Sequence, residues 1–346
     1  MASARNRRPA AGQLIAVALA AVVLIPACTS PPQHHAAGRP ARRDVPAPPP
    51  ARAPGRPSGL GTLGAYRVGE RQVTFAEPAH TGPDGQDLGQ RLLMTQIRYP
   101  MARRAAGPAP AGGPFPLLLF APGFMQCGGP YSRLLHAWAS AGYVVAVVNF
   151  PRTDCRARAA AYEPDLVNQP ADMSFVLSRL LALSMKPRGL FSGLLDQHEI
   201  AAAGQSDGGD TVAALAANPC CADRRLDAAA VLSGAEWPAM PGRYFRHGAP
   251  PMLFVQGSAD PVNPPWTSLQ LYRADGADRR YYLDLLGANH MVPYVGSNPV
   301  EQLVARVTLA FFDRYVLGRA RSLAVMRRDG TVRGSAALVS GNRLPP

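Results

Sequence analysis

The chain has 346 residues, 47% of them hydrophobic, which is enough to bury a substantial core. Its net charge is +13, but every basic residue except Lys186 is arginine and no dense basic run occurs in the long domain. This indicates a coding bias toward arginine. A nucleic-acid footprint needs basic residues clustered on one face together with a recognisable module, so we expect no nucleic-acid partner.

The first 27 residues have the pattern of a secretory signal. Three arginines precede the apolar run Leu14–Ile25, which is too short to cross a bilayer as a stable anchor. The run ends in Leu-Ile-Pro-Ala-Cys28, which resembles a bacterial lipobox, a motif whose cysteine becomes the lipidated first residue of the mature protein. The resemblance implies an exported lipoprotein, held on the outer face of the membrane through Cys28. An ordinary cleaved signal with an incidental cysteine is the alternative.

Residues 28–60 are rich in Pro, Ala, Arg and Gly and lack periodic apolar positions. Such a stretch cannot bury enough surface to offset its ordering entropy, so we predict a disordered tether. No later apolar run is long enough to span a bilayer, which leaves Cys28 as the expected membrane contact. The chain thus divides into a signal (1–27), a tether (28–60), a folded domain (61–318) and a C-terminal extension (319–346).

Apolar runs and segments of helical spacing alternate from about residue 61. The runs predict strands at 73–75, 92–99, 117–120, 144–150, 200–203, 229–233, 252–256 and 281–286, and the spacing predicts helices at 131–141, 165–186, 211–217, 268–274 and 299–316. This alternation is typical of an α/β fold with a mostly parallel central sheet covered by helices on both faces. In such sheets the chemistry lies just beyond the carboxyl ends of the strands. Residues 319–346 predict a short appended hairpin or a loose end.

A strand–turn–helix motif contains the candidate nucleophile. The segment Gly204-Gln-Ser206-Asp-Gly208 follows a predicted strand and opens a predicted helix. A serine on so sharp a turn requires small flanking residues, and this spacing is that of a nucleophile elbow. We predict Ser206 as the nucleophile, the alternative being a Gly-rich turn with a solvent-facing serine.

A serine hydroxyl needs a base, and the base needs an acid to orient it. Of the seven histidines only His290 follows a late strand, and a loop histidine without a role is its alternative. For the acid we predict Asp260, because the segment Gly257-Ser-Ala-Asp260 comes directly after the strand at 252–256 and lies between serine and histidine in the chain, whereas Asp284 lies inside the next strand. The alternative for Asp260 is a turn-forming aspartate before Pro261.

The backbone donors of an oxyanion hole follow from position alone. They are the N–H after the nucleophile, which belongs to Asp207, and one from the loop after an early strand, for which Phe124 is the best candidate.

These motifs occur in an order that resembles a known family. The segments are Ala121-Pro-Gly-Phe124, Ala141-Gly-Tyr-Val-Val145, Gly204–Gly209, Gly257-Ser-Ala-Asp260 and Gly287-Ala-Asn-His290. Together, over residues 65–317, they look like the cutinase, polyester-hydrolase and dienelactone-hydrolase-like branch of bacterial α/β-hydrolases, near the platelet-activating-factor acetylhydrolase-like esterases. The resemblance implies an α/β-hydrolase fold and carboxylic-ester hydrolysis without a cofactor.

The chain departs from this family at two positions. Dienelactone hydrolases proper use a cysteine nucleophile, and Ser206 favours ordinary ester hydrolysis instead. Asp207 stands where cutinase-like enzymes usually have Met, which weakens the expectation of a polyester substrate.

The expected site is shallow and open. Only residues 236–250 separate two successive strands at the place where lid-bearing relatives insert a cap, so no large cap domain fits. Trp237 lies where the resembled polyester hydrolases carry a substrate-contacting Trp. An apolar pocket for an ester substrate would be completed by Phe124, Met125, Trp266 and Met291, unless these side chains only pack the loops.

The four cysteines after Cys28 allow three pairings, and sequence alone does not choose among them. Cys127 and Cys155 each follow a neighbouring strand end, so a bridge that supports the oxyanion loop is our preferred hypothesis. Cys220 and Cys221 have no His or Cys partner at ligand spacing, so we expect no metal site there.

The leading functional hypothesis is a monomeric, cofactor-free serine esterase of the cell envelope. An acyltransferase with the same triad, in which an alcohol replaces water, is the second. A non-catalytic lipoprotein that keeps the fold is the third, and the complete constellation argues against it.

Overall fold

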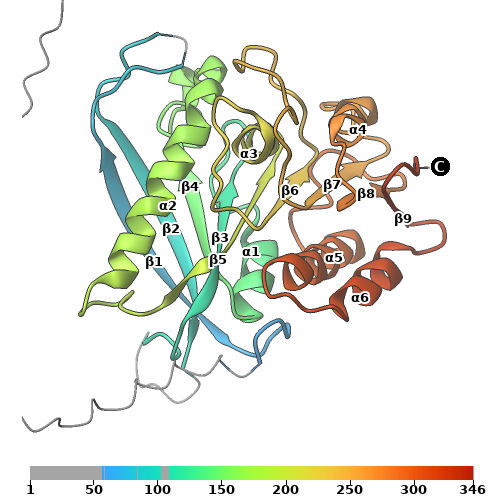
Figure 1. The fold of residues 1–346 in the computed structure, drawn as a ribbon, viewed down its shortest axis with the longest axis horizontal. Helices are drawn as coiled ribbons and strands as arrows, with labels where there is room; N and C mark the ends of the chain where they lie inside the picture. Colours follow the sequence, from blue (N-terminus) through green and yellow to red (C-terminus); the bar gives the residue numbers. More distant parts are fainter. Residues whose placement is uncertain (1–56, 58, 84, 103–108, 346) are drawn as a thin grey trace, which may run out of the picture. The chain divides into compact units, whose positions relative to one another are not determined.

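A computed structural model describes residues 57, 59–83, 85–102 and 109–345 (Figure 1). The expected signal segment and Cys28 lie outside the described residues. The strands are β1 (Arg67–Glu77), β2 (Arg91–Met101), β3 (Phe115–Ala121), β4 (Val144–Asn149), β5 (Leu195–Gln205), β6 (Ala228–Leu232), β7 (Met252–Gly257), β8 (Arg280–Leu285) and β9 (Ala336–Ser340). The helices are α1 (Ser132–Ser140), α2 (Gln169–Met185), α3 (Asp207–Ala217), α4 (Pro265–Ala274), α5 (Pro299–Tyr315) and α6 (Ser322–Gly330), with short 3₁₀ turns η1 (Arg158–Ala160) and η2 (Glu163–Asn168).

The strands form one nine-stranded sheet in the order β1-β2-β4-β3-β5-β6-β7-β8-β9. Strands β4, β3, β5, β6, β7 and β8 are parallel, whereas β1, β2 and β9 are antiparallel to their neighbours. The fold is therefore α/β with a mostly parallel, mixed sheet, as the alternation of apolar runs and helical spacing predicts.

The central strands are apolar on both faces. Every residue of β3, β4, β6, β7 and β8 is buried, which explains why these sequences are largely apolar without alternation, although β8 also buries Arg280 and Asp284. β1 has the half-exposed pattern of an edge strand. The core thus lies on both sides of the parallel strands.

The order of the strands decides where helices lie. The chain steps from β3 through α1 to β4 on one side, then returns through α2 to β5 on the other side of β3. Because such crossovers are right-handed, the reversal places α1 and α2 on opposite faces of the sheet. α5 packs against α1, and α3 packs against α2 (Figure 1). Ligand sites of such sheets lie at this reversal, outside the carboxyl ends of β3 and β5.

The C-terminal extension differs from the predicted hairpin or loose end. Residues 319–346 contain α6, which packs on α5, and β9, which pairs antiparallel with β8 along its length. Its short apolar run Ala336–Ser340 completes the sheet edge, so the folded unit includes this segment and does not end at residue 318.

Three helices begin three or four residues away from the predicted start, among them α4, which begins at Pro265 and not at 268. α2 begins at Gln169, after the 3₁₀ turn η2 that covers the first residues of the predicted helix 165–186. α3 begins at Asp207, four residues before the predicted start, directly after the candidate nucleophile. The glycines at 208 and 209 have low helix propensity and hide this start in the sequence.

A buried ion cluster joins β2 to the segment before α2. The guanidinium of Arg91 donates to both oxygens of Asp165, at 3.0 and 2.8 Å, and to both oxygens of Asp172, at 2.7 and 2.6 Å. All three side chains are at most 3% exposed. This cluster fixes η2 and the start of α2 against the edge of the sheet.

Candidate active site

The candidate nucleophile lies on a strained turn between β5 and α3. Ser206 has φ 57° and ψ −126°, a conformation that L-residues rarely adopt. The glycines around it are required by close backbone contacts. A Cβ at Gly204 would overlap the carbonyl of Gly208, and a Cβ at Gly208 would overlap the carbonyl of Ala121. The predicted elbow is thus formed by the Gly-x-Ser-x-Gly segment.

The structure brings the three predicted catalytic side chains together. Nε2 of His290 lies 2.9 Å from Oγ of Ser206, and its Nδ1 lies 2.7 Å from Oδ2 of Asp260. All three residues are at most 9% exposed. A glycine again permits the approach, because a Cβ at Gly257 would overlap the carbonyl of Ala288 in the histidine loop.

Asp260 satisfies both alternatives that the sequence left open. It contacts His290, and it also forms the turn before Pro261. Its Oδ1 accepts the backbone N–H groups of Val262 and Asn263 at 2.9 and 3.0 Å, and its Oδ2 accepts the amide of Gln256 at 3.1 Å. These donors hold the carboxylate in one orientation. They leave Oδ2 directed at Nδ1 of His290, which selects the tautomer with a free Nε2 lone pair facing Ser206.

The loop after β3 lies against the nucleophile. A Cβ at Gly123 would stand 2.9 Å from Oε1 of Gln205 and 3.1 Å from Cβ of Ser206, so only glycine allows this approach. Phe124 follows directly, and no hydrogen bond between described residues uses its N–H. Asp207 is the first residue of α3, so its N–H is at a helix N-terminus. Of the two predicted oxyanion donors, Asp207 thus follows Ser206 directly, and Phe124 follows the glycine that approaches it.

The same loop is fastened to the segment after β4. Cys127 and Cys155 form a disulfide with a Cα–Cα distance of 5.3 Å, and the N–H of Met125 donates to the carbonyl of Thr153 at 2.7 Å. The preferred pairing is thus the one in the structure. The other two cysteines, Cys220 and Cys221, are bonded to each other.

Sequence reasoning missed two polar side chains at the site, Gln205 and Tyr131. Nε2 of Gln205 lies 3.2 Å from the carbonyl oxygen of His290 and 3.2 Å from its Nε2, and Oε1 of Gln205 accepts the hydroxyl of Tyr131 at 2.7 Å. Gln205 directly precedes Ser206 in the serine motif, so the sequence could have indicated it as a polar residue near the nucleophile. Tyr131, which precedes α1, has no signal in the sequence.

Asp207 occupies an unusual environment for a carboxyl group. It is 8% exposed, and its Oδ2 has no hydrogen-bond partner within the described part of the chain. Burial, and then the charge of Glu163, raise the pKa of Asp207 to about 7. Burial raises the pKa of Asp210 as well, three residues further along α3. The carboxyl that follows the nucleophile is therefore close to half ionised at neutral pH.

The predicted pocket side chains differ in exposure. Met125 and Trp266 are 43% and 64% exposed, whereas Trp237 and Met291 are half-buried against the core. Val262 and Val292, each two residues after Asp260 or His290 in the chain, are also exposed, at 61% and 41%. Four apolar side chains, Met125, Val262, Trp266 and Val292, are thus exposed, and we refer to them as the rim.

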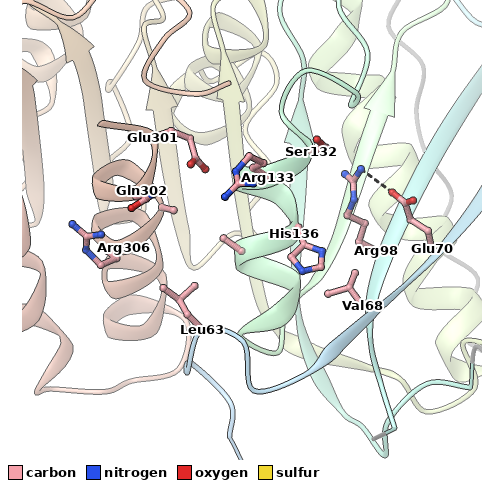
Figure 2. A pocket seen from close by; sticks show the side chains of 12 residues that line it. Leu63, Val68, Glu70, Arg98, Ser132, Arg133, His136, Glu301, Gln302 and Arg306 are labelled. Atoms are coloured by element: carbon pink, nitrogen blue, oxygen red, sulfur yellow. Dashed lines mark ion pairs between the residues drawn. The ribbon is translucent and has the colours of Figure 1, made fainter. Parts of the chain in front are cut away.

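A cavity of about 770 Å³ lies elsewhere, between α1, α5 and the β1–β2 edge (Figure 2). Arg98 and Glu70 form an ion pair of 2.7 Å on one side, Arg133 and His136 line the middle, and none of the triad residues borders it. A second cavity, of about 470 Å³, is lined by residues 243–246 and Ala274. The candidate triad therefore does not border the larger of these two cavities.

Within the described ranges, no three His, Cys, Asp or Glu side chains are grouped so that they could hold a metal ion. No helix in the same ranges is long and apolar enough to cross a membrane. The sequence matches no protein-family model and no curated protein.

Proposed function

We propose that the protein is a serine carboxylic-ester hydrolase of the α/β-hydrolase type. The observation that carries the proposal is the position of His290 between Ser206 Oγ, at 2.9 Å, and Asp260 Oδ2, at 2.7 Å. A nucleophile, a base and an orienting acid in hydrogen-bond contact are the geometric signature of acyl transfer through a serine.

The reaction follows from this geometry. His290 Nε2 takes the hydroxyl proton as Ser206 Oγ attacks the ester carbonyl, and the new oxyanion is held by the N–H groups of Asp207 and Phe124. The imidazolium, stabilised by Asp260, then gives its proton to the departing alcohol. Water repeats the attack on the acyl-enzyme, with His290 as its base, and releases the acid.

An open site and an apolar rim support an ester with an apolar acyl or alcohol part. The stretch between β6 and β7 contains no helix or strand that could cover the site, in accord with the missing cap. Met125, Val262 and Val292 are exposed on loops, and Trp266 is exposed in the first turn of α4. The proposed location is the cell envelope, with the membrane contacted through the lipid on Cys28. The resemblance to cutinase-like and acetylhydrolase-like esterases belongs to the same proposal.

The test is covalent labelling combined with ester hydrolysis. A fluorophosphonate probe should label the wild type and fail to label Ser206→Ala, and His290→Gln should label far more slowly. On p-nitrophenyl esters of graded chain length, Ser206→Ala should lower kcat by about 10⁴- to 10⁶-fold. Folded wild-type protein that neither reacts with the probe nor hydrolyses any ester would refute the proposal. Added alcohols that divert the acyl group from water would identify the acyltransferase instead.

A further inference from the structure

We infer that Gln205, held by Tyr131, is a positioning residue that fixes the base His290 and the oxyanion loop relative to the nucleophile. The inference rests on the proposed function and deepens it. Its evidence is a chain of hydrogen bonds that joins three separate segments: the loop after β3, the end of β5 and the histidine loop after β8.

The chain begins at the oxyanion loop. The N–H of Gly123 donates to the hydroxyl oxygen of Tyr131 at 3.3 Å, and that hydroxyl donates to Oε1 of Gln205 at 2.7 Å. Tyr131 is fully buried, and burial raises its pKa, so its hydroxyl keeps the proton it donates. Because Tyr131 accepts one hydrogen bond and donates the other, the direction of both bonds is fixed.

The chain continues to the base. Nε2 of Gln205 donates to the carbonyl oxygen of His290 at 3.2 Å. A carbonyl oxygen only accepts, so the amide presents its NH₂ group to His290 and its oxygen to Tyr131. The opposite orientation would place two acceptor oxygens face to face. Gln205 is fully buried, and each of its amide ends thus has a partner.

This orientation has a chemical consequence at the reacting atoms. The same Nε2 of Gln205 lies 3.2 Å from Nε2 of His290, the nitrogen that faces Ser206 Oγ at 2.9 Å. An amide NH₂ cannot accept the proton that His290 takes from the serine. Ser206 Oγ is the oxygen that lies beside Nε2 in this structure, so the amide does not draw the proton away from the reaction path.

The oxyanion loop depends on the same amide. Gly123 approaches Gln205 so closely that a Cβ would lie 2.9 Å from Oε1. Movement of the amide therefore changes the position of Gly123, and with it the N–H of the adjacent Phe124. A misplacement of catalytic groups by about 1 Å costs up to about 100-fold in rate.

A double-mutant cycle tests the inference with the full chain. Tyr131→Phe, which removes only the hydroxyl, and Gln205→Leu, which removes the amide, should each lower kcat between about 10- and 100-fold and change KM by less than about threefold. Since Tyr131 contacts both Gln205 and the N–H of Gly123, the loss in the double variant should be clearly smaller than the product of the two single losses. The matched control is Tyr143→Phe, which removes a buried hydroxyl that donates to Asp313 at 3.0 Å. Tyr143 directly precedes β4, so it lies at the end of the strand opposite to the candidate site.

Effects that multiply in the double variant, or an unchanged kcat in Tyr131→Phe, would overturn the inference. A second measurement works without enzymatic activity. It also does not require that the Gln205→Leu variant folds. The NMR signal of the Nδ1–H between His290 and Asp260, assigned by its loss in His290→Gln, should shift in Tyr131→Phe and stay in place in Tyr143→Phe. An unshifted signal in Tyr131→Phe also overturns the inference. A wild type without esterase activity, by contrast, refutes only the proposed reaction.

Discussion

Asp207→Asn should stabilise the protein by an amount that grows as the pH rises. The substitution keeps the size of the side chain and removes its charge. In the folded protein the pKa of Asp207 is raised from 3.8 to about 7, mainly by burial and then by the charge of Glu163. Between these two values the unfolded chain has lost the proton and the folded chain has kept it.

The direction and the size of the effect follow from linkage. A carboxyl whose pKa is higher in the folded state makes the free energy of unfolding fall as pH rises from 3.8 to about 7, after which the loss is complete. A rise of this size corresponds to about 4 kcal/mol as an upper limit, and about 2 kcal/mol is a conservative expectation. Asparagine does not titrate, so its advantage should be smallest near pH 4 and should level off above pH 7.

Urea denaturation at several pH values between 4 and 8 measures this difference. Asp278→Asn, at an exposed position, is the control and should show little dependence on pH. Glu163→Gln removes the second cause, so it should move the transition of the wild-type carboxyl to lower pH. A gap between Asp207→Asn and wild type that stays constant from pH 4 to 8 would refute the reasoning.

The same carboxyl gives a kinetic expectation if Ser206 acts as proposed. Ionised Asp207 places a negative charge beside the N–H that would hold the oxyanion, and the two charges repel. Ester hydrolysis by the wild type should therefore decline above about pH 7, and Asp207→Asn should keep its rate there. If the rate declined equally in the wild type and in Asp207→Asn, the charge of Asp207 would have no effect on hydrolysis. The stability prediction would not be affected.

Other substitutions test the supports of the site. Arg91→Ala leaves two buried carboxylates without their shared cation and should lower the free energy of unfolding by about 3 to 5 kcal/mol in denaturant titrations. Cys155→Ser opens the bridge to Cys127, 28 residues away in the chain, and should cost about 3 to 4 kcal/mol by the same assay. Gly257→Ala forces a methyl group against the carbonyl of Ala288. It should lower the rate of fluorophosphonate labelling even where the melting temperature stays close to that of the wild type.

The parts of the molecule that sequence predicts well are those with a local pattern. The strand at 144–150 is readable because a β-branched run buried on both faces has no other common structure. The sequence indicates Ser206, Asp260 and His290 because each lies one to five residues beyond the end of a strand, and parallel strands bring their carboxyl ends to one edge. Their distances, in contrast, depend on glycine contacts such as Gly257 with Ala288, which the sequence does not reveal.

The parts that sequence predicts poorly depend on partners far along the chain. The run Ala336–Ser340 is too short and too mixed to indicate a strand, and it becomes one because β8 offers an open edge. Tyr131 looks like one more apolar residue beside α1, and its hydroxyl gains a role only because Gln205 lies 74 residues away in the chain and 2.7 Å away in space. Such pairings are tertiary, and local propensity does not encode them.

The exposed rim and the fixed loop after β3 have different roles in the candidate site. A site without a cap cannot rely on closure to assemble its donors, so the donors must be in place before the substrate arrives. In this structure the loop after β3 is fixed by the Cys127–Cys155 bridge on one side and by the contact of Gly123 with Gln205 on the other. Flexibility can then be confined to the exposed rim. For the proposed esterase, this predicts that rim substitutions such as Trp266→Ala change KM and chain-length preference, whereas changes at Gln205 lower kcat.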